Sequence, residues 1–450
     1  MKKLFVLIIL VFAVCSCEKD STNKIEEAKS ITLPELTSSA VSEITETSVK
    51  SGGNITNDGG APITARGICW STTANPTTSD NSTLDGTNAG SFTSSLNDLV
   101  ENTIYYLRAY ATNIKGTSYG NELSFKTLEK PELVIEGDVN LRTQEMIDDF
   151  GAYGFARVSG NLLILADFGS NINSLKPLEG LKTVDGDFYI NNTNLTSFEG
   201  LNNLTVVGGN IQIQYNNELS SIDHLTSIKE IGGFLDIDSN PSLKNLDGLE
   251  NLTTISRWLG IDFNETLENI DALSNLKSIE YGLTIQSNPA LKNINGLSSL
   301  TSVGYELTID KNALITNLDG LKSLTKVGSY IVISYNDALT NILGLNKLEI
   351  INDRLVIHNN DSLINLDGLE NIVQIDDFLG ISSNKSLVEI NGLNNLSTLN
   401  GKLIISYNLA LNNFCGIKPL IDNGFSNSFD IASNSFNPTQ QDILKGNCSQ

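Results

Sequence analysis

One residue type returns at a fixed interval through the second half of the chain. Asparagines stand 24 residues apart at Asn216, Asn240, Asn264, Asn288, Asn312, Asn336, Asn360, Asn384 and Asn408. A repeat of this length cannot bury an apolar face alone and becomes stable only by stacking against its neighbours. The interval therefore predicts a solenoid.

Aliphatic residues follow the same interval in a stricter pattern. Apolar residues stand at steps of 3, 3, 3, 3, 4 and 2, and ten rows between Ile172 and Ile405 obey this rule. The final step of 2 predicts a short strand with alternate side chains inward, and stacked strands would form one parallel sheet. The steps of 3 are too tight for an α-helical face and predict extended or 3₁₀-like segments. One turn is a residue short, and Thr193 takes the asparagine position there.

Two further columns are assigned structural roles. We expect each asparagine amide to bond the backbone of its own coil and of its neighbours, since nine identical rungs favour architecture over ligand binding. Glycine often stands between the second and third apolar positions, and we expect it to supply a left-handed bend at each coil. These glycines are Gly200, Gly248, Gly296, Gly320, Gly344, Gly368 and Gly392.

The pattern Leu-x-Ile-x-x-Asn, followed by Leu-x-x-Leu-x-Gly-Leu, resembles the leucine-rich-repeat superfamily and more closely the receptor L-domain type of coil. The resemblance covers about residues 137–450 within a domain of residues 129–450. It implies a right-handed parallel β solenoid with short capping helices, and recognition of a partner. We expect an N-cap at 137–165 with a helix from Thr143 to Phe150, repeats at 172–410, and a C-cap at 411–450 with a helix over residues 437–444.

Cys415 and Cys448 flank the expected C-terminal cap. In an oxidising compartment a disulfide between them is favoured, and two buried thiols are the alternative.

Residues 31–128 carry short alternating strands and turn signals that predict a β-sandwich. Leu99, Asn102, Thr103 and Tyr105 form a tyrosine-corner pattern. With Gly-Ile-Cys-Trp-Ser-Thr from residue 67, this segment resembles the fibronectin type III-like domains of Gram-negative surface lipoproteins. It departs at Glu101, where proline is usual. The resemblance implies a spacer or docking module, and Cys69 is interpreted as a buried thiol.

The N-terminal segment predicts where the protein is located. Two lysines precede the apolar run of residues 4–14, so residues 1–16 are typical of a secretion signal too short to span a bilayer. Val14-Cys15-Ser16-Cys17 resembles a bacterial lipobox with lipidation of Cys17, and a plain secretion signal is the alternative. Residues 17–30 are expected to form a flexible tether. Its Glu18-Lys19-Asp20 start resembles an outer-leaflet sorting signal or is a solvated linker. We expect an outer-membrane lipoprotein that faces the exterior.

Composition limits the chemistry. The chain has 52 Asp and Glu against 29 Lys and Arg, so nucleic-acid binding is excluded by charge. Only two histidines occur, and the adjacent Asp376 and Asp377 read as solvated turn residues. We therefore expect no catalytic residues, cofactor or metal. We also expect the protein to be a monomer.

Residues that point outward from the strands vary freely between coils. The candidate ligand-binding residues are Phe234, Asp236, Asp238, Trp258, Asp262 and, farther along, Tyr330. Two large aromatics beside carboxylates would give a flat apolar anchor with oriented acceptors for a glycan or a protein. Gly260 is expected to leave room for a ring to lie flat. The alternatives are scattered surface residues or a Ca²⁺ site, although no loop shows a calcium motif.

These features favour a non-enzymatic, lipid-anchored surface protein whose solenoid presents a binding face to a protein or glycan. A structural or accessory role in an outer-membrane complex is the main alternative, and an enzyme of unrecognised type is a third.

Overall fold

The computed structural model describes residues 30–167, 169 and 171–450, and the chain divides into two compact units between Pro131 and Glu132. The expected signal, lipidated Cys17 and nearly all of the tether lie outside the described residues. Within the described ranges, no helix is long and apolar enough to cross a membrane.

The N-terminal unit is built from two antiparallel sheets. One sheet orders β1 (Glu35–Ser42), β2 (Val49–Asn57) and β5 (Gly90–Leu96). The other orders β4 (Asn81–Ser82), β3 (Ala65–Ser71), β6 (Ile104–Asn113) and β7 (Gly116–Tyr119), with β8 (Leu123–Lys126) also on β6. Val49, Leu96, Ile68 and Leu107 are buried in the core between them. The Val100 amide donates to the Tyr105 hydroxyl at 3.0 Å, so the tyrosine corner forms despite Glu101.

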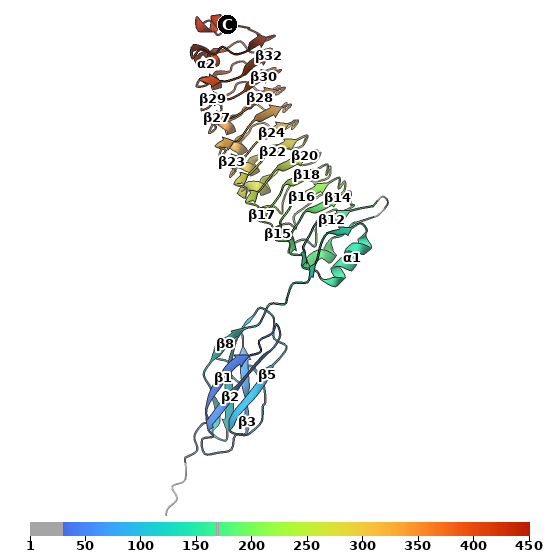
Figure 1. Ribbon diagram of the computed structural model, residues 1–450, viewed down its shortest axis with the longest axis vertical. Helices are drawn as coiled ribbons and strands as arrows, with labels where there is room; N and C mark the ends of the chain where they lie inside the picture. Colours follow the sequence, from blue (N-terminus) through green and yellow to red (C-terminus); the bar gives the residue numbers. More distant parts are fainter. Residues whose placement is uncertain (1–29, 168, 170) are drawn as a thin grey trace, which may run out of the picture. The chain divides into compact units, whose positions relative to one another are not determined.

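The second unit is the predicted parallel solenoid, and the protein is mainly β. Its long sheet holds 13 strands, which Figure 1 shows stacked coil upon coil. In order they are β10 (Val139–Leu141), β12 (Leu162–Leu165), β14 (Phe188–Asn191), β16 (Ile211–Gln214), β18 (Leu235–Asp238), β20 (Leu259–Asp262), β22 (Leu283–Gln286), β24 (Leu307–Asp310), β26 (Ile331–Ser334), β28 (Arg354–His358), β30 (Phe378–Ser382), β32 (Lys402–Ser406) and β33 (Phe429–Ala432). The register follows the repeat, since Leu235 pairs with Leu259 and Leu259 with Leu283.

Every coil except the last, which carries β33, also contributes a two-residue strand to a second parallel side that the sequence did not reveal. Nine such strands form one sheet: β9 (Val134–Ile135), β11 (Arg157–Val158), β13 (Thr183–Val184), β15 (Val206–Val207), β17 (Glu230–Ile231), β19 (Thr254–Ile255), β21 (Ser278–Ile279), β23 (Ser302–Val303) and β25 (Lys326–Val327). Three more form another: β27 (Ile350–Ile351), β29 (Gln374–Ile375) and β31 (Thr398–Leu399).

The expected 3₁₀ character is present in several coils as short 3₁₀ turns. These are η1 (Lys176–Gly180), η2 (Asp271–Asn275), η3 (Asn295–Leu297), η4 (Asp319–Leu321), η5 (Leu343–Leu345), η6 (Asn391–Leu393) and η7 (Cys415–Ile417).

The asparagine column forms the expected ladder in the buried interior. Asn288 donates from Nδ2 to the carbonyl of Ile261 at 2.7 Å and to that of Gln286 at 3.0 Å. Its Oδ1 accepts the Asn264 backbone amide at 3.1 Å. In the short coil, Thr193 donates from Oγ1 to Asn216 at 2.7 Å. The ladder thus satisfies backbone groups that the strand ends would leave buried and unpaired.

The left-handed bend lies beside this ladder rather than at glycine. The residue before each asparagine of the column has φ between 53° and 59°, and none of these residues is glycine. They are Tyr215, Ser239, Phe263, Ser287, Lys311, Tyr335, Asn359, Ser383 and Tyr407. Such a conformation costs an L-residue roughly 1–2 kcal/mol, so the ladder has to hold it in place.

The expectation of a left-handed bend at the recurrent glycines is wrong for four of the seven. Gly200, Gly248 and Gly368 have φ of 112°, 109° and 111°. Positive φ is not found at the other four, Gly296, Gly320, Gly344 and Gly392. Instead, a Cβ at Gly320 would lie 1.9 Å from the Ile294 carbonyl oxygen of the preceding coil. Close stacking of the coils is therefore the reason for glycine there.

Both ends of the solenoid are covered. Helix α1 (Gln144–Tyr153) begins after the N-cap Thr143, whose Oγ1 accepts the Met146 amide. At the other end α3 (Gln440–Leu444) begins only after the N-cap Thr439, and α2 (Lys418–Asp422) was not predicted. Cys415 and Cys448 form a disulfide with their Cα atoms 4.9 Å apart.

Replacing Asn288 by alanine should lower the free energy of unfolding by about 2–4 kcal/mol, because several buried backbone groups lose their partners. Asn288→Thr should lose clearly less, since Thr193 already fills the equivalent position. Urea denaturation of both variants measures the difference, and equal losses would refute the ladder's role.

Candidate functional site

Five of the six candidate ligand-binding residues lie together on two neighbouring strands of the long sheet. Phe234 and Trp258 directly precede β18 and β20. The register places Asp236 opposite Gly260 and Asp238 opposite Asp262. Neighbouring strands are about 4.8 Å apart, so these side chains form one patch. We call Phe234, Asp236, Asp238, Trp258 and Asp262 the Trp258 patch.

The indole of Trp258 lies over its own strand. A Cβ placed on Gly260 would lie 2.1 Å from the Trp258 Cη2 atom, so the ring covers this glycine. The indole Nε1 donates to Thr284 Oγ1 at 3.2 Å, and the Phe234 ring meets the indole edge-on with centroids 6.4 Å apart. Gly260 does leave room for a flat ring, and the ring that fills this room is the indole of Trp258 itself. Because the indole is half-buried with its inner face on Gly260, its outer face remains for a partner.

Two of the three carboxylates already have protein partners. Asp236 is 8% exposed, and its Oδ2 accepts from the side-chain amides of Gln212 at 3.2 Å and Gln214 at 2.7 Å. Asp238 accepts the Ser239 hydroxyl at 3.0 Å. Burial raises the pKa of both carboxyl groups above the usual range. Asp236 is thus a structural group more than an outward acceptor.

Asp262 differs from them because its Oδ1 is buried and has no hydrogen-bond partner. Burial, followed by the charges of Asp236 and Asp238, raises the pKa of Asp262 to about 7. A backbone hydrogen bond with Gln286, the neighbour in register, opposes this rise, whereas the side chain of Gln286 donates to Asp310 at 2.8 Å. An unpaired buried acceptor costs roughly 1–3 kcal/mol. Oδ1 itself is covered, but the Asp262 side chain is only half-buried, so its other carboxylate oxygen is the one a ligand hydroxyl can reach.

Tyr330 belongs to a different cluster, three coils beyond Trp258. Tyr281 and Tyr305 stack with centroids 4.9 Å apart, and Tyr305 meets Tyr330 edge-on at 5.8 Å. The Arg354 guanidinium lies 4.5 Å from the centroid of Tyr330. These rings pair mainly with one another, so Tyr330 does not extend the Trp258 patch.

Sequence reasoning missed a second ring with the same setting as Trp258. A Cβ on Gly380 would lie 2.7 Å from Cε1 of Phe378, so this ring also covers a glycine of its own strand. The signal was present, because Phe378-Leu379-Gly380-Ile381 repeats the pattern of Trp258-Leu259-Gly260-Ile261. An aromatic residue two positions before a strand glycine identifies both.

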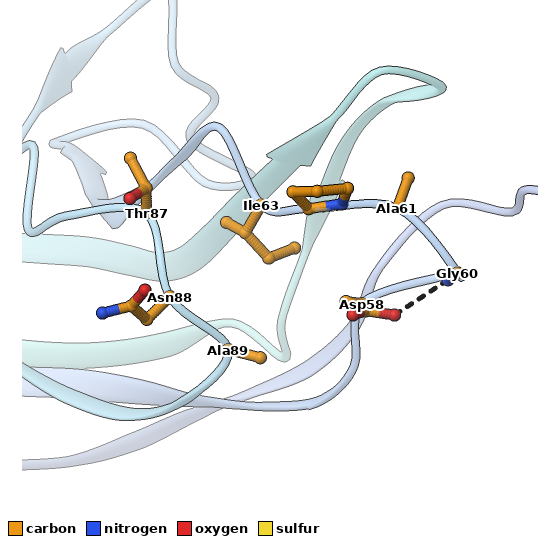
Figure 2. Close-up of a pocket in the computed structure, with 8 residues that line it drawn as sticks. Asp58, Gly60, Ala61, Ile63, Thr87, Asn88 and Ala89 are labelled. Atoms are coloured by element: carbon orange, nitrogen blue, oxygen red, sulfur yellow. Dashed lines mark hydrogen bonds between the residues drawn. The ribbon is translucent and has the colours of Figure 1, made fainter.

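The other candidate sites, a pocket of the N-terminal unit and the Cys69 thiol, have fewer features of a binding or catalytic site. Figure 2 shows a pocket of the N-terminal unit lined by short side chains and backbone, where Asp58 Oδ1 accepts the Gly60 amide at 2.8 Å. Cys69 is a buried thiol whose Sγ donates to the Pro76 carbonyl, and burial raises its pKa to about 11. Among the described residues, no cluster of three or more His, Cys, Asp or Glu side chains is arranged to hold a metal ion.

The raised pKa of Asp262 predicts a pH-dependent stability. The folded-state pKa of about 7 lies above the ordinary 3.8, so its contribution is greatest below pH 4 and is lost as pH rises through 7. Asp262→Asn should therefore gain on the order of 2 kcal/mol over the wild type on going from pH 4 to pH 8. Urea unfolding at the two pH values tests this, and parallel curves for both proteins would contradict it.

Comparison with known proteins identifies a segment of the solenoid. Residues 205–262, which include the whole Trp258 patch, match the receptor L domain family model. No curated protein matches. A short form of the sensor domain of the anti-sigma factor RsgI4 in Pseudobacteroides cellulosolvens is 20% identical, over 22% of this chain and 100% of its own, with a TM-score of 0.18. A fibronectin type III domain derived from human KIAA0970 protein is 14% identical, over 26% and 91%, also at 0.18. Scores this low establish no shared fold. The family match likens the segment with the Trp258 patch to a receptor domain, a recognition-type module.

Proposed function

We propose that this is a non-enzymatic recognition protein that binds an extracellular partner, a protein or a glycan, through the Trp258 patch. One observation carries the proposal. A half-buried indole is fixed on the sheet beside the half-buried carboxyl group of Asp262, which the neighbouring side chains leave without a full set of hydrogen bonds. Binding hot spots are rich in large aromatic anchors such as tryptophan, and here the anchor lies next to a carboxyl group.

The scaffold supports binding because it holds the patch rigidly. Trp258 is restrained by Gly260 below, by the hydrogen bond to Thr284 and by the edge of Phe234. Side chains that are already ordered lose little entropy when a partner binds. Strand positions also place such groups more accurately than loops do.

The surroundings of the two histidines, the side chains best suited to acid–base catalysis, support a non-enzymatic role. Nδ1 of His224 lies 2.5 Å from Oδ1 of Asp223. Nδ1 of His358 is hydrogen-bonded to the side-chain Nδ2 of Asn359 at 2.8 Å. Neither histidine ring is thus paired with a nucleophile in the part of the chain that the structure describes. We propose no catalytic residue, no cofactor and no metal.

We further propose that the protein is a monomeric lipoprotein anchored through Cys17 in the outer membrane and facing the exterior. The tether and the fibronectin type III-like sandwich would carry the solenoid away from the membrane. The alternative is a structural or accessory part of an outer-membrane complex. The Trp258 patch favours recognition, since a purely structural sheet face needs no such group.

Binding arrays of glycans and host proteins test the recognition proposal. Trp258→Ala and Phe234→Ala should each weaken binding to the wild-type hits by tenfold or more, because each removes a part of the apolar anchor. Tyr407→Ser is the control, since Tyr407 is exposed elsewhere on the solenoid and serine occupies the same column in other coils. Hits that all survive both patch substitutions would rule the patch out.

Membrane fractionation tests the anchor. Cys17→Ser should move the full chain from the membrane fraction to the soluble periplasmic or secreted fraction, because no other lipidation site is proposed. Retention of the variant in the membrane fraction would contradict the lipoprotein assignment. Protease treatment of intact cells checks the exterior orientation, which fails if the wild-type protein is spared.

A further inference from the structure

We propose that the partner is a neutral, linear glycan that lies along the solenoid axis and stacks on both Trp258 and Phe378. This inference rests on the proposed recognition function and names the chemistry of its ligand.

The first step is that the two rings are built as a pair of platforms. In both coils the ring lies over a glycine in the middle of its own strand, at Gly260 and at Gly380. Where another aromatic residue holds the same position, at Phe234 and Tyr330, the strand residue beneath is Asp236 or Val332 and leaves no such space. Glycine weakens a strand interior. Its coincidence with the aromatic residue in two coils indicates that the flat placement itself matters.

The second step is the distance between the platforms. Strands β20 and β30 are five coils apart in the same sheet, which corresponds to roughly 24 Å along the axis. A single small ligand cannot reach both rings. The strand positions in line with the two glycines are Thr284, Thr308, Val332 and Val356, which all have short side chains. Beside them lie Tyr330 and Arg354, which pack on each other and would border the sugar chain. An extended chain of about six sugar units matches this length, since a sugar unit is about as long as the strand spacing.

The third step is the chemistry of the Trp258 platform. A pyranose ring presents C–H groups on a face and hydroxyl groups around its rim. The C–H groups carry partial positive charge and pack on the negative face of an indole. Asp262 lies two residues after Gly260, so its carboxyl group is on the same side of the sheet as the ring. The Asp262 side chain is half-buried, so a rim hydroxyl of a sugar stacked on the indole would donate to the carboxylate oxygen that remains accessible.

The fourth step is charge. The Trp258 platform is bordered by Asp238 and Asp262, whereas Phe378 lies in register between Arg354 and Lys402. Hydroxyl groups donate to carboxylates and accept from cations, so a neutral sugar chain suits both platforms. A uniformly charged polymer would be repelled at one of them, and the net charge of −23 opposes polyanions in general.

The test is isothermal titration of the full chain with neutral β-linked gluco-, xylo-, manno- and galacto-oligosaccharides, from disaccharide to octasaccharide. Affinity for one of these series should rise at least tenfold between the trisaccharide and the hexasaccharide, where the second platform is reached. Phe378→Ala should abolish this gain and leave trisaccharide binding unchanged. Trp258→Ala should abolish binding at every length, and Asp262→Asn should weaken it at every length.

Three controls separate recognition from folding. Thermal unfolding of each variant shows that it folds, Trp258→Phe should retain at least a tenth of the affinity, and Tyr407→Ser should not change it. Length-independent affinity, or equal losses for short and long sugars in Phe378→Ala, would overturn the two-platform arrangement. If no oligosaccharide series binds but Trp258→Ala loses the protein hits of the array, the glycan proposal is overturned and the proposed recognition function stands. If the Trp258 and Phe234 variants also keep every protein hit, both proposals fail.

Discussion

The structure depends on a buried hydrogen-bond ladder that ties each coil to the next. Each asparagine amide bonds the carbonyl of the preceding coil and accepts the backbone amide from it, as Asn288 does with Ile261 and Asn264. A buried backbone group without a partner is costly, so the ladder also forces the residue before each asparagine into the left-handed region. The coil spacing and strand register follow from this constraint, and with them the position of every outward side chain.

The ladder and the aliphatic columns determine the conformation of the coil. The outward strand positions can therefore vary without disturbing the fold. That freedom has a cost where glycine replaces a larger residue, as at Gly260 and Gly380. In return an aromatic ring rests directly on the backbone and gains a fixed orientation. The loss of strand stability and the gain of a rigid ring come from the same substitution, which links the packing of the coil to what its surface can bind.

The repeated parts of the fold could be predicted from the sequence. A residue type that recurs at every coil indicates that each of these positions has the same surroundings. The core rows, the asparagine ladder and the capping helix α1 all follow from periodicity or local capping at Thr143. The second sheet was missed because two-residue strands such as Thr254–Ile255 carry no alternation. An aromatic residue two positions before a strand glycine indicates the indole over Gly260. The isolation of Asp262 Oδ1 could not be predicted, because it depends on the conformations of neighbouring side chains, which no repeat encodes.

The contrast between Asp262 and Asp310 argues that Asp262 is not explained by stability. Both carboxylates occupy the last position of a strand in the long sheet. Asp310 is satisfied from both sides, by Gln286 at 2.8 Å and by Ser334 at 2.6 Å. Asp262 lies between Asp238 and Gln286, and the side-chain amide of Gln286 donates to Asp310 rather than to Asp262. Serine fills this position in other coils at no electrostatic cost, as at Ser382 and Ser406. Asp262 therefore keeps a carboxylate oxygen, Oδ1, that no neighbouring side chain satisfies, and this fits the recognition role proposed for the Trp258 patch.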